Sequence, residues 1–380
     1  MQSSQSIESS LSPLVPAYAS ILSLAPYQAG KPVEELTREY GISDVVKLAS
    51  NENPVGCSPK VTLAITEQLG QLARYPDGNG YYLKQALADF NDVNVDQITL
   101  GNGSDDLLDI LARSFVGAGD AIVYSQYAFV VYSMLAKMQG AMDVEVPAQR
   151  FGHDLKAMSQ AVQDNPNTKL VFIANPNNPT GTQLAHKELY AFMASVPSSV
   201  LVVLDEAYIE YSPESNNRAL LDEFDNVVIV RTFSKAYGLA GLRVGYALSS
   251  VAVADLLNRI RQPFNVSRIG LAAAAAALAD QDFIERTRLM NDEQMRWLEK
   301  QFDALGLGFI KSHANFIMVK IEVEMEDITA ASIHEALLEQ GVIIRPLAAY
   351  GLHNWLRITV GLAEDNLRLI DTLRSILTDD

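Results

Sequence analysis

The sequence predicts an α/β protein with a large domain, built on a mostly parallel sheet wrapped by helices, and a smaller α+β domain at the C-terminus. Two observations lead to this prediction. Short β-branched runs alternate with longer helical patterns as far as about residue 305, and the pattern then changes to strand, helix and two further strands. With 380 residues, 48% of them hydrophobic, the chain can bury a large core and divide into two domains.

Seven strands are predicted in the large domain, and most are continuous apolar runs, as expected when both faces of a sheet are covered. They are "QITLGNG" (97–103), "DAIVYS" (120–125), "MDVEVP" (142–147), "KLVFIANP" (169–176), "VLVVLDEAY" (200–208), "NVVIVRTFS" (226–234) and "RVGYALS" (243–249). Helices are expected between them, for example at 104–116 and 187–196.

A long helical region, roughly 249–305, precedes the small domain. Its strands are expected within 309–321, 341–347 and 355–361, with a helix between the first two. We expect residues 1–45 to form an N-terminal arm and part of the small domain, 46–270 the large domain, and 271–380 the small C-terminal domain. The first residues lack the positive segment of a signal peptide, and Pro13 and Pro16 interrupt their apolar stretch, so we expect a frayed tail that leads into a short helix.

Composition narrows the functional classes. The 29 Lys plus Arg residues against 46 Asp plus Glu give a formal net charge of −17, which argues against nucleic acid as a partner and leaves room for a small anionic substrate in a local basic pocket. Cys57 is the only cysteine, which suits a reducing, cytoplasmic location. The five histidines are scattered without metal-ligand spacing, and no apolar run approaches the roughly 20 residues of a membrane span, so neither a metal nor a membrane is expected.

Open α/β sheets bind ligands at the carboxyl ends of their strands, and unusual groups fall there. "GNGSDD", residues 101–106, is a glycine-containing turn that opens a helix, where free N–H groups and the helix dipole favour a phosphate. Taken alone, this turn is at least as often only a capped helix start. "NPNNPTG", residues 175–181, offers the amide of Asn178 but by itself is better explained as a rigid turn.

The next two strand ends add charged groups. Asp205 follows five apolar residues and is costly to bury unless it has a cationic partner. The strand "VVIVRTFSK" then delivers Thr232, Ser234 and Lys235 to the same edge. Four strand ends that supply a phosphate cradle, an amide, a carboxylate and a lysine together indicate a site for a phosphorylated cofactor with a basic ring nitrogen.

"NPNNPTG", "DEAY" and "SKAYGLAGLRVGY", in this order, resemble the fold-type I pyridoxal-phosphate aminotransferases over nearly the whole chain. The resemblance implies the aspartate aminotransferase-like fold and pyridoxal 5'-phosphate as cofactor. Within the family, "KLASNENPVG", "RYPD", "GNGSDD", "RQPFNVS" and "LRITVG" are most similar to the histidinol-phosphate branch.

The resemblance also implies roles for the residues around the cofactor. Lys235 would carry the cofactor covalently and then move a proton between the substrate and the cofactor, and Asp205 would keep the ring nitrogen protonated. Asn178 and Tyr208 would bind the phenolic oxygen. The phosphate ligands would be Arg243, Ser104, Thr232, Ser234 and the backbone of Gly103 and Asp105. Tyr127, in "SQYAFVVY", is expected to stack on the ring, although Ser125-Gln126 departs from the usual "P-x-Y" pattern.

Substrate contacts are implied in the same way. Arg357 would bind the anionic end of the substrate, with Arg345 as a second cation for a dianion, while Tyr27 and Asn53 would close over the substrate. Tyr75 would reach the cofactor phosphate of a partner subunit, which makes the protein a homodimer. Glu206 is expected to be a structural neighbour, and Cys57 a small buried residue.

Three functions stay open at this point. The first is amino transfer between L-histidinol phosphate and 2-oxoglutarate, with glutamate as product, through a ping-pong exchange between the pyridoxal and pyridoxamine forms of the cofactor. The second is an aromatic amino-acid aminotransferase, or a related decarboxylase of the same fold. The third, a regulator with an idle aminotransferase fold, is disfavoured because such regulators carry an N-terminal DNA-binding domain, whereas this acidic chain reaches its expected "PYQ" gate by residue 26.

Overall fold

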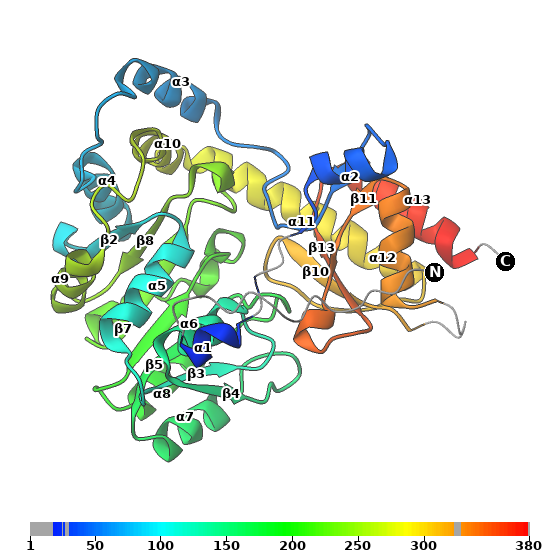
Figure 1. The fold of residues 1–380 in the computed structure, drawn as a ribbon. Coiled ribbons are helices and arrows are strands. Elements are labelled where there is room, and N and C mark those ends of the chain that lie inside the picture. The colour runs from blue at the N-terminus through cyan, green and yellow to red at the C-terminus, as the bar shows by residue number, and fades with distance from the viewer. Residues whose placement is uncertain (1–17, 25, 27–29, 323–327, 379–380) are drawn as a thin grey trace.

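The computed structural model describes residues 18–24, 26, 30–322 and 328–378, and its ribbon is shown in Figure 1. The helices are α1 (Ala19–Leu22), α2 (Val33–Tyr40), α3 (Pro59–Gln68), α4 (Tyr81–Asn91), α5 (Ser104–Phe115), α6 (Val131–Gln139), α7 (Leu155–Asp164), α8 (His186–Ser195), α9 (Val251–Ile260), α10 (Arg268–Leu278), α11 (Gln281–Ala304), α12 (Ala330–Glu339) and α13 (Ala363–Thr378). The strands are β1 (Val46–Lys47), β2 (Ile98–Gly101), β3 (Ala121–Ser125), β4 (Met142–Val146), β5 (Thr168–Ala174), β6 (Leu201–Asp205), β7 (Val227–Thr232), β8 (Gly245–Leu248), β9 (Gly308–Ile310), β10 (Phe316–Lys320), β11 (Val342–Ile343), β12 (Arg345–Pro346) and β13 (Trp355–Thr359).

All seven strands predicted for the large domain lie in one sheet of order β2-β8-β7-β6-β5-β3-β4. The pairs from β4 to β7 are parallel, and β8 runs antiparallel to both of its neighbours, so the predicted mostly parallel sheet is confirmed. Asp205 lies in register with Ala174 on one side and Val230 on the other. The loops that follow β5, β6 and β7 therefore begin at one edge of the sheet.

Helices cover both faces of this sheet, which explains the continuous apolar strands. In β6, Val202 and Leu204 belong to a core shared with α4, α7, α8 and α10, whereas Leu201 and Val203 belong to a second core shared with α5, α6 and α9. Every residue of β6 is consequently buried, including the terminal Asp205.

The smaller unit is an antiparallel sheet of order β12-β13-β10-β9, packed with α11, α12 and α13 around its own apolar core. Strand β1 pairs in parallel with β11, so an N-terminal segment joins this C-terminal unit. Figure 1 shows α2 and β11 beside α12 and α13. The proposed domain boundary after residue 45 lies just before β1 and that after residue 270 lies inside α10, and both remain predictions.

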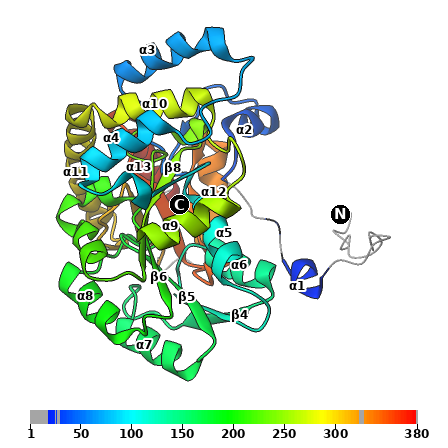
Figure 2. The same cartoon turned by 90° about the vertical axis from the view of Figure 1, so that its left-hand side faces the viewer.

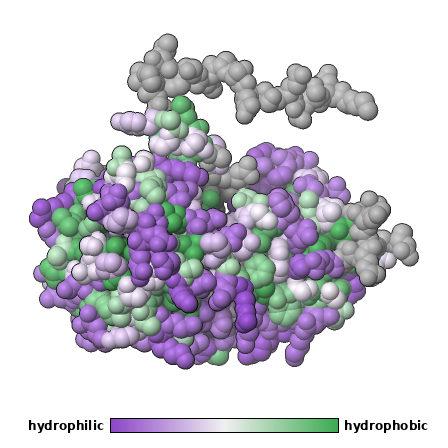
Figure 3. All heavy atoms as spheres, turned by 90° about the horizontal axis from the view of Figure 1, so that it is seen from below, coloured by the Kyte–Doolittle hydropathy of each residue, from purple (hydrophilic) through white to green (hydrophobic). Residues whose placement is uncertain are grey.

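The outside of the molecule includes a helix at one edge, α3, and a face on which hydrophilic residues predominate. Figure 2 shows α3 at one edge of the molecule, lying along α10, with which it packs. On the face seen in Figure 3, hydrophilic residues predominate and hydrophobic residues are scattered among them. Within the described part of the chain, no helix combines the length and apolarity needed to cross a bilayer.

Candidate active site

A cavity of about 220 Å³ opens where β5, β6 and β7 end, and the smaller unit and the segment before α3 complete its walls. Most of the residues predicted from the strand ends and from the family motifs line it. These are Ser104, Asp105, Asn178, Asp205, Tyr208, Thr232, Ser234, Lys235, Arg243, Arg345 and Arg357. The fold thus gathers residues that are up to 253 positions apart in the chain, from Ser104 to Arg357, around one volume.

One end of the cavity has the features of a phosphate cradle. Ser104 is the first residue of α5, whose N-terminal N–H groups and dipole favour an anion. Gly103, with φ +85°, brings the backbone so close to Arg243 that an added Cβ would lie 2.4 Å from Nη2 of that arginine. Nη1 of Arg243 donates to Oγ of Ser234 at 3.3 Å. A helix N-terminus, a hydroxyl and a guanidinium on one small concavity fit a phosphate monoester.

Lys235 lies between this cradle and the smaller unit. Its Nζ donates to the carbonyl oxygen of Ser50 at 3.2 Å and lies 5.6 Å from the ring centroid of Tyr208. The amine therefore lies at the wall of the cavity, where the carbonyl oxygen of Ser50 is one of its acceptors.

Asp205 is the last residue of β6 and is only 5% exposed. Its Oδ2 accepts a hydrogen bond from the hydroxyl of Tyr132 at 2.8 Å, and its Oδ1 accepts one from the N–H of Ala207 at 3.2 Å. Burial raises the pKa of this carboxyl to about 6, and the nearby Asp105 adds to the rise, whereas Tyr132 and Lys235 oppose it. A buried carboxylate facing a cavity is a suitable partner for a cationic ring nitrogen.

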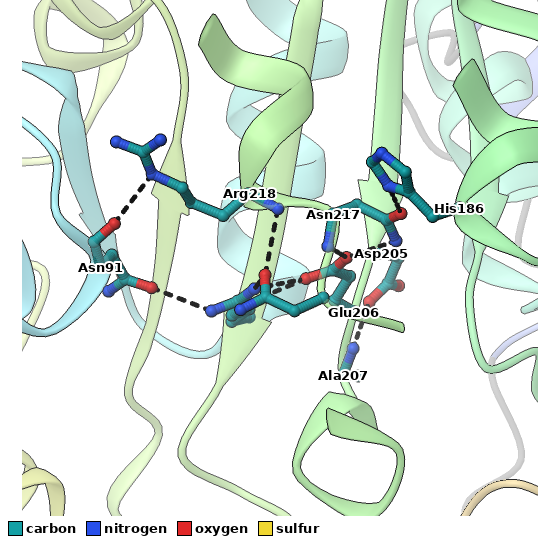
Figure 4. A network of polar contacts seen from close by, with 9 residues as sticks. Asn91, His186, Asp205, Glu206, Ala207, Asn217 and Arg218 are labelled. Atoms are coloured by element: carbon teal, nitrogen blue, oxygen red, sulfur yellow. Dashed lines mark hydrogen bonds and ion pairs between the residues drawn. The ribbon is translucent and has the colours of Figure 1, made fainter. Parts of the chain in front are cut away.

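Glu206, the next residue, is directed away from this cavity, because successive side chains at a strand end alternate in direction. It is fully buried, and its Oε2 accepts from Nη2 of Arg231 at 2.7 Å while Oε1 accepts from Nδ2 of Asn217 at 2.9 Å. Figure 4 shows Asp205 and Glu206 with their separate polar partners. Glu206 is thus a structural neighbour, as expected.

The phenol of Tyr208 and the amide of Asn178 lie on the wall shared with the smaller unit. Nη1 of Arg357 donates to Oδ1 of Asn178 at 2.6 Å, and Nη2 donates to the carbonyl oxygen of Ala49 at 2.7 Å. Burial raises the pKa of Tyr208 to about 12, against the opposing effect of Arg357. Arg345 lies opposite Arg357 across the β12–β13 pair, so two guanidinium groups reach the same end of the cavity.

Asn53 does not line the cavity, and its expected contact with the substrate remains a prediction. Its Nδ2 donates to the carbonyl oxygen of Ala236 at 2.8 Å, which fixes the chain beside Lys235. Asn51 lines the cavity instead, and its Nδ2 donates to the hydroxyl of Tyr208 at 2.9 Å. The left-handed backbone of Asn51, φ +56°, turns the chain between these two amides and so separates their environments.

Tyr127 is likewise outside the cavity lining. Its ring stacks on Phe151 with centroids 5.8 Å apart, and its own φ of +55° turns the chain before α6. Phe129, two residues later, lines the cavity and lies edge-on to Tyr132 at 6.0 Å. Phe129 is therefore an aromatic wall of the cavity, and a second aromatic residue in "YAFVVY" was the available sequence signal. The expected stacking of Tyr127 on the cofactor ring remains a prediction.

The remaining residues that the sequence suggested either do not line this cavity or lie outside the described residues. Tyr75 is 77% exposed and stacks on Phe264 with centroids 4.6 Å apart. Cys57 is only partly buried, at the margin of the large core, and not fully buried as expected. Tyr27 lies outside the described residues.

Comparison with known proteins identifies relatives over almost the full length. Residues 43–373 match the family described as aminotransferase class I and II. The chain is 88% identical over its whole length to histidinol-phosphate aminotransferase 1 of Psychrobacter arcticus, all of which it covers.

Among solved structures, that of histidinol-phosphate aminotransferase from Sinorhizobium meliloti in complex with pyridoxal-5'-phosphate superimposes with a TM-score of 0.88 at 33% identity, covering 97% of this chain and 100% of that one. A double mutant of Thermus thermophilus aspartate aminotransferase, at 23% identity, superimposes with a TM-score of 0.82 over 96% of this chain and 100% of its own. The predicted aspartate aminotransferase-like fold is confirmed.

The buried ion pair of Arg231 and Glu206, which lies outside the cavity, leads to a prediction about stability. Replacing Arg231 by methionine leaves the carboxylate of Glu206 buried without its guanidinium, so the free energy of unfolding in urea should fall by about 3–5 kcal/mol. Arg259→Met is the matched control, because the pair of Arg259 with Asp255 is exposed and should change the free energy by less than about 1 kcal/mol. Equal losses in both variants would contradict a special role of the buried pair.

Proposed function

The chain belongs to the class I and II aminotransferase family, within its histidinol-phosphate aminotransferases, and from this premise we propose the roles of the residues in its cavity. It is a pyridoxal-phosphate-dependent transaminase of histidine biosynthesis that acts on histidinol phosphate. The observation that carries the proposed roles is the joint placement of Lys235, Asp205 and the Ser104–Arg243 cradle around one cavity. The identity of the relatives disfavours an aromatic amino-acid aminotransferase or a decarboxylase.

The cradle is proposed to hold the cofactor by its phosphate. The N-terminus of α5, with Ser104 and the backbone of Gly103 and Asp105, supplies N–H and hydroxyl donors. Thr232 and Ser234 add hydroxyls, and Arg243 supplies a planar guanidinium. When bound, pyridoxal phosphate supplies a carbonyl carbon that bonds to amines and a ring that withdraws electrons from the substrate.

Three side chains act on the atoms that react. The carboxylate of Asp205 would accept a hydrogen bond from the protonated ring nitrogen of the cofactor, and its negative charge would keep that nitrogen protonated. Lys235 would hold the cofactor through its amine, and the same amine would be the group that moves a proton at the substrate α-carbon. Tyr208, with Asn178, binds the phenolic oxygen, and Asn51 orients the Tyr208 hydroxyl by donating to it.

The opposite end of the cavity selects the substrate. Arg357 is held by Asn178 and by the carbonyl of Ala49, so its guanidinium is already positioned before an anion arrives. Arg345 adds a second positive charge beside it, as the phosphate dianion of histidinol phosphate requires. We propose 2-oxoglutarate as the acceptor, with its α-carboxylate on Arg357. Tyr27 remains a proposed substrate contact.

A homodimer is proposed from the exposed apolar surface around α3 and α4. Exposed large hydrophobic side chains gather there at Leu63, Leu69, Leu72, Tyr75, Tyr81 and Tyr82. Such a concentration on one edge of the molecule is typical of an interface. In the dimer, Tyr75 would extend into the cavity of the partner subunit. We also propose a cytoplasmic location, in keeping with a biosynthetic enzyme whose single cysteine remains a thiol.

Borohydride reduction of the holoenzyme should fix the cofactor irreversibly on Lys235, because Lys235 is the lysine that lines the cavity. Peptide mapping by mass spectrometry identifies the modified residue. Lys235→Ala should still bind pyridoxal phosphate, but without a covalent bond. Label on Lys169 or Lys187 would show that the site is assigned to the wrong lysine.

Phe129→Leu should weaken noncovalent binding of pyridoxal phosphate by about 3- to 10-fold, the contribution of one aromatic contact of roughly 0.5–1.5 kcal/mol. The dissociation constant is measured by fluorescence titration in the Lys235→Ala background. Tyr127→Leu, outside the cavity lining, serves as the control and should change affinity less than twofold. A larger loss with Tyr127→Leu than with Phe129→Leu would restore Tyr127 as the stacking residue.

Arg345→Ala should reduce kcat/KM for histidinol phosphate about tenfold more than for glutamate, because the dianion loses one of two cations whereas a carboxylate keeps Arg357. Steady-state kinetics of both half-reactions on one preparation measure the ratio. Arg374→Ala, on the exposed surface of α13, is the charge-matched control and should leave the ratio unchanged. Equal losses on both substrates would show that Arg345 does not recognise the phosphate.

A further inference from the structure

Beneath the cavity, the phenol of Tyr132 contacts the carboxylate proposed to face the cofactor. Tyr132 lies on α6 and is fully buried, and its hydroxyl donates to Oδ2 of Asp205 across 2.8 Å. No family motif in the sequence pointed to this residue.

Aromatic packing fixes the ring of Tyr132 in one orientation. It stacks on Phe172 of β5 with centroids 4.6 Å apart and planes within 6° of parallel. Phe129, the aromatic wall of the cavity, meets the same ring edge-on at 6.0 Å and 89°. One side chain therefore contacts both the carboxylate and the aromatic wall of the site.

The two oxygens of Asp205 are held by different donors. Tyr132 binds Oδ2 and the N–H of Ala207 binds Oδ1, and each carboxylate oxygen has a further lone pair for another donor. Together these two hydrogen bonds fix the plane of the carboxylate while leaving it able to accept from the cavity side.

The groups around Asp205 have opposing effects on its pKa, and the phenol of Tyr132 is one of those that lower it. Burial raises the pKa of Asp205 to about 6, and Asp105 on α5 raises it further, whereas Tyr132, the N–H of Ala207 and Lys235 lower it. Burial and the charge of Asp205 raise the pKa of Tyr132 well above its usual value, so Tyr132 remains a proton donor throughout the working range. Burial is the main cause of the raised pKa of Tyr208, and the charge of Asp205 adds to the rise.

We propose that Tyr132 is a positioning residue for the transamination, whose hydroxyl keeps Asp205 ionised and oriented toward the cofactor ring nitrogen while its ring supports Phe129. This inference deepens the proposed function of Asp205 and depends on it. Because the ionised form of Asp205 is the one required, activity falls as the pH drops through its pKa. Loss of the phenol's hydrogen bond raises that pKa, and the acid limb of the pH profile therefore moves to higher pH.

Tyr132→Phe tests the proposal, since it removes only the hydroxyl and keeps the stacked ring. The acid limb of kcat/KM should move up by about 0.5–1 pH unit, and at pH 7 the affinity for pyridoxal phosphate in the Lys235→Ala background should fall about twofold, because a pKa raised by about one unit from about 6 leaves roughly half of Asp205 ionised. At pH 9, where Asp205 is ionised in either variant, most of the lost affinity should return. A purely structural loss would not recover with pH.

Tyr124→Phe is the matched control. Tyr124 lies in the same apolar core beside Tyr132, but its hydroxyl donates to Asp143 at 2.6 Å and not to Asp205. Its pH profile and cofactor affinity should match those of the unmodified chain. A pH-independent loss in Tyr132→Phe, or the same shift in Tyr124→Phe, would overturn the proposal.

Asp205→Asn separates this inference from the proposed function. An inactive Asp205→Asn with an unchanged Tyr132→Phe would refute only the role of Tyr132. A fully active Asp205→Asn would refute the role of Asp205 itself, and with it any positioning by Tyr132.

Discussion

The negative charge of Asp205 must be maintained in a place that water hardly reaches, and much of the site is arranged around that constraint. Desolvation at the end of β6 favours the neutral acid, which cannot hold a protonated ring nitrogen. A backbone N–H, the phenol of Tyr132 and the amine of Lys235 each favour the charged form. The carboxylate can thus be buried and still be largely ionised at neutral pH, as its proposed pairing with the cofactor ring nitrogen requires.

Asp205 and Glu206, two consecutive buried carboxylates at the end of β6, are stabilised by different partners. Glu206 is neutralised permanently by Arg231, with an amide from Asn217, and has no contact with the cavity. The two oxygens of Asp205 accept from neutral donors, the hydroxyl of Tyr132 and the N–H of Ala207, which leave its net charge available to a ligand. The alternation of side chains along a strand separates the structural role from the chemical one.

The cavity also depends on contact between the two sheets. Arg357 comes from the small sheet, yet its guanidinium donates to Asn178 in the loop after β5 and to the carbonyl of Ala49 in the N-terminal segment. Asn51 links the same segment to Tyr208 of the large unit and accepts from the hydroxyl of Thr359 at the end of β13. Direct hydrogen bonds consequently join the proposed substrate end of the site to its proposed cofactor end. A movement of the small sheet relative to the large sheet would therefore change the geometry at both ends.

The sequence by itself determined the α/β fold, the strand order in the chain, the cofactor and the residues at the strand ends, because apolar runs and motif spacing depend only on local pattern. Lys235, Asp205 and Asn178 were predictable because Asp205 ends a buried strand and the other two lie within four residues of the end of one. Asn51 and Phe129 line the cavity whereas Asn53 and Tyr127 do not, and the left-handed backbone at Asn51 and at Tyr127 accompanies this difference. The pairings of Tyr132 with Asp205 and of Arg231 with Glu206 join residues 73 and 25 positions apart, and only tertiary packing brings such side chains within hydrogen-bonding distance.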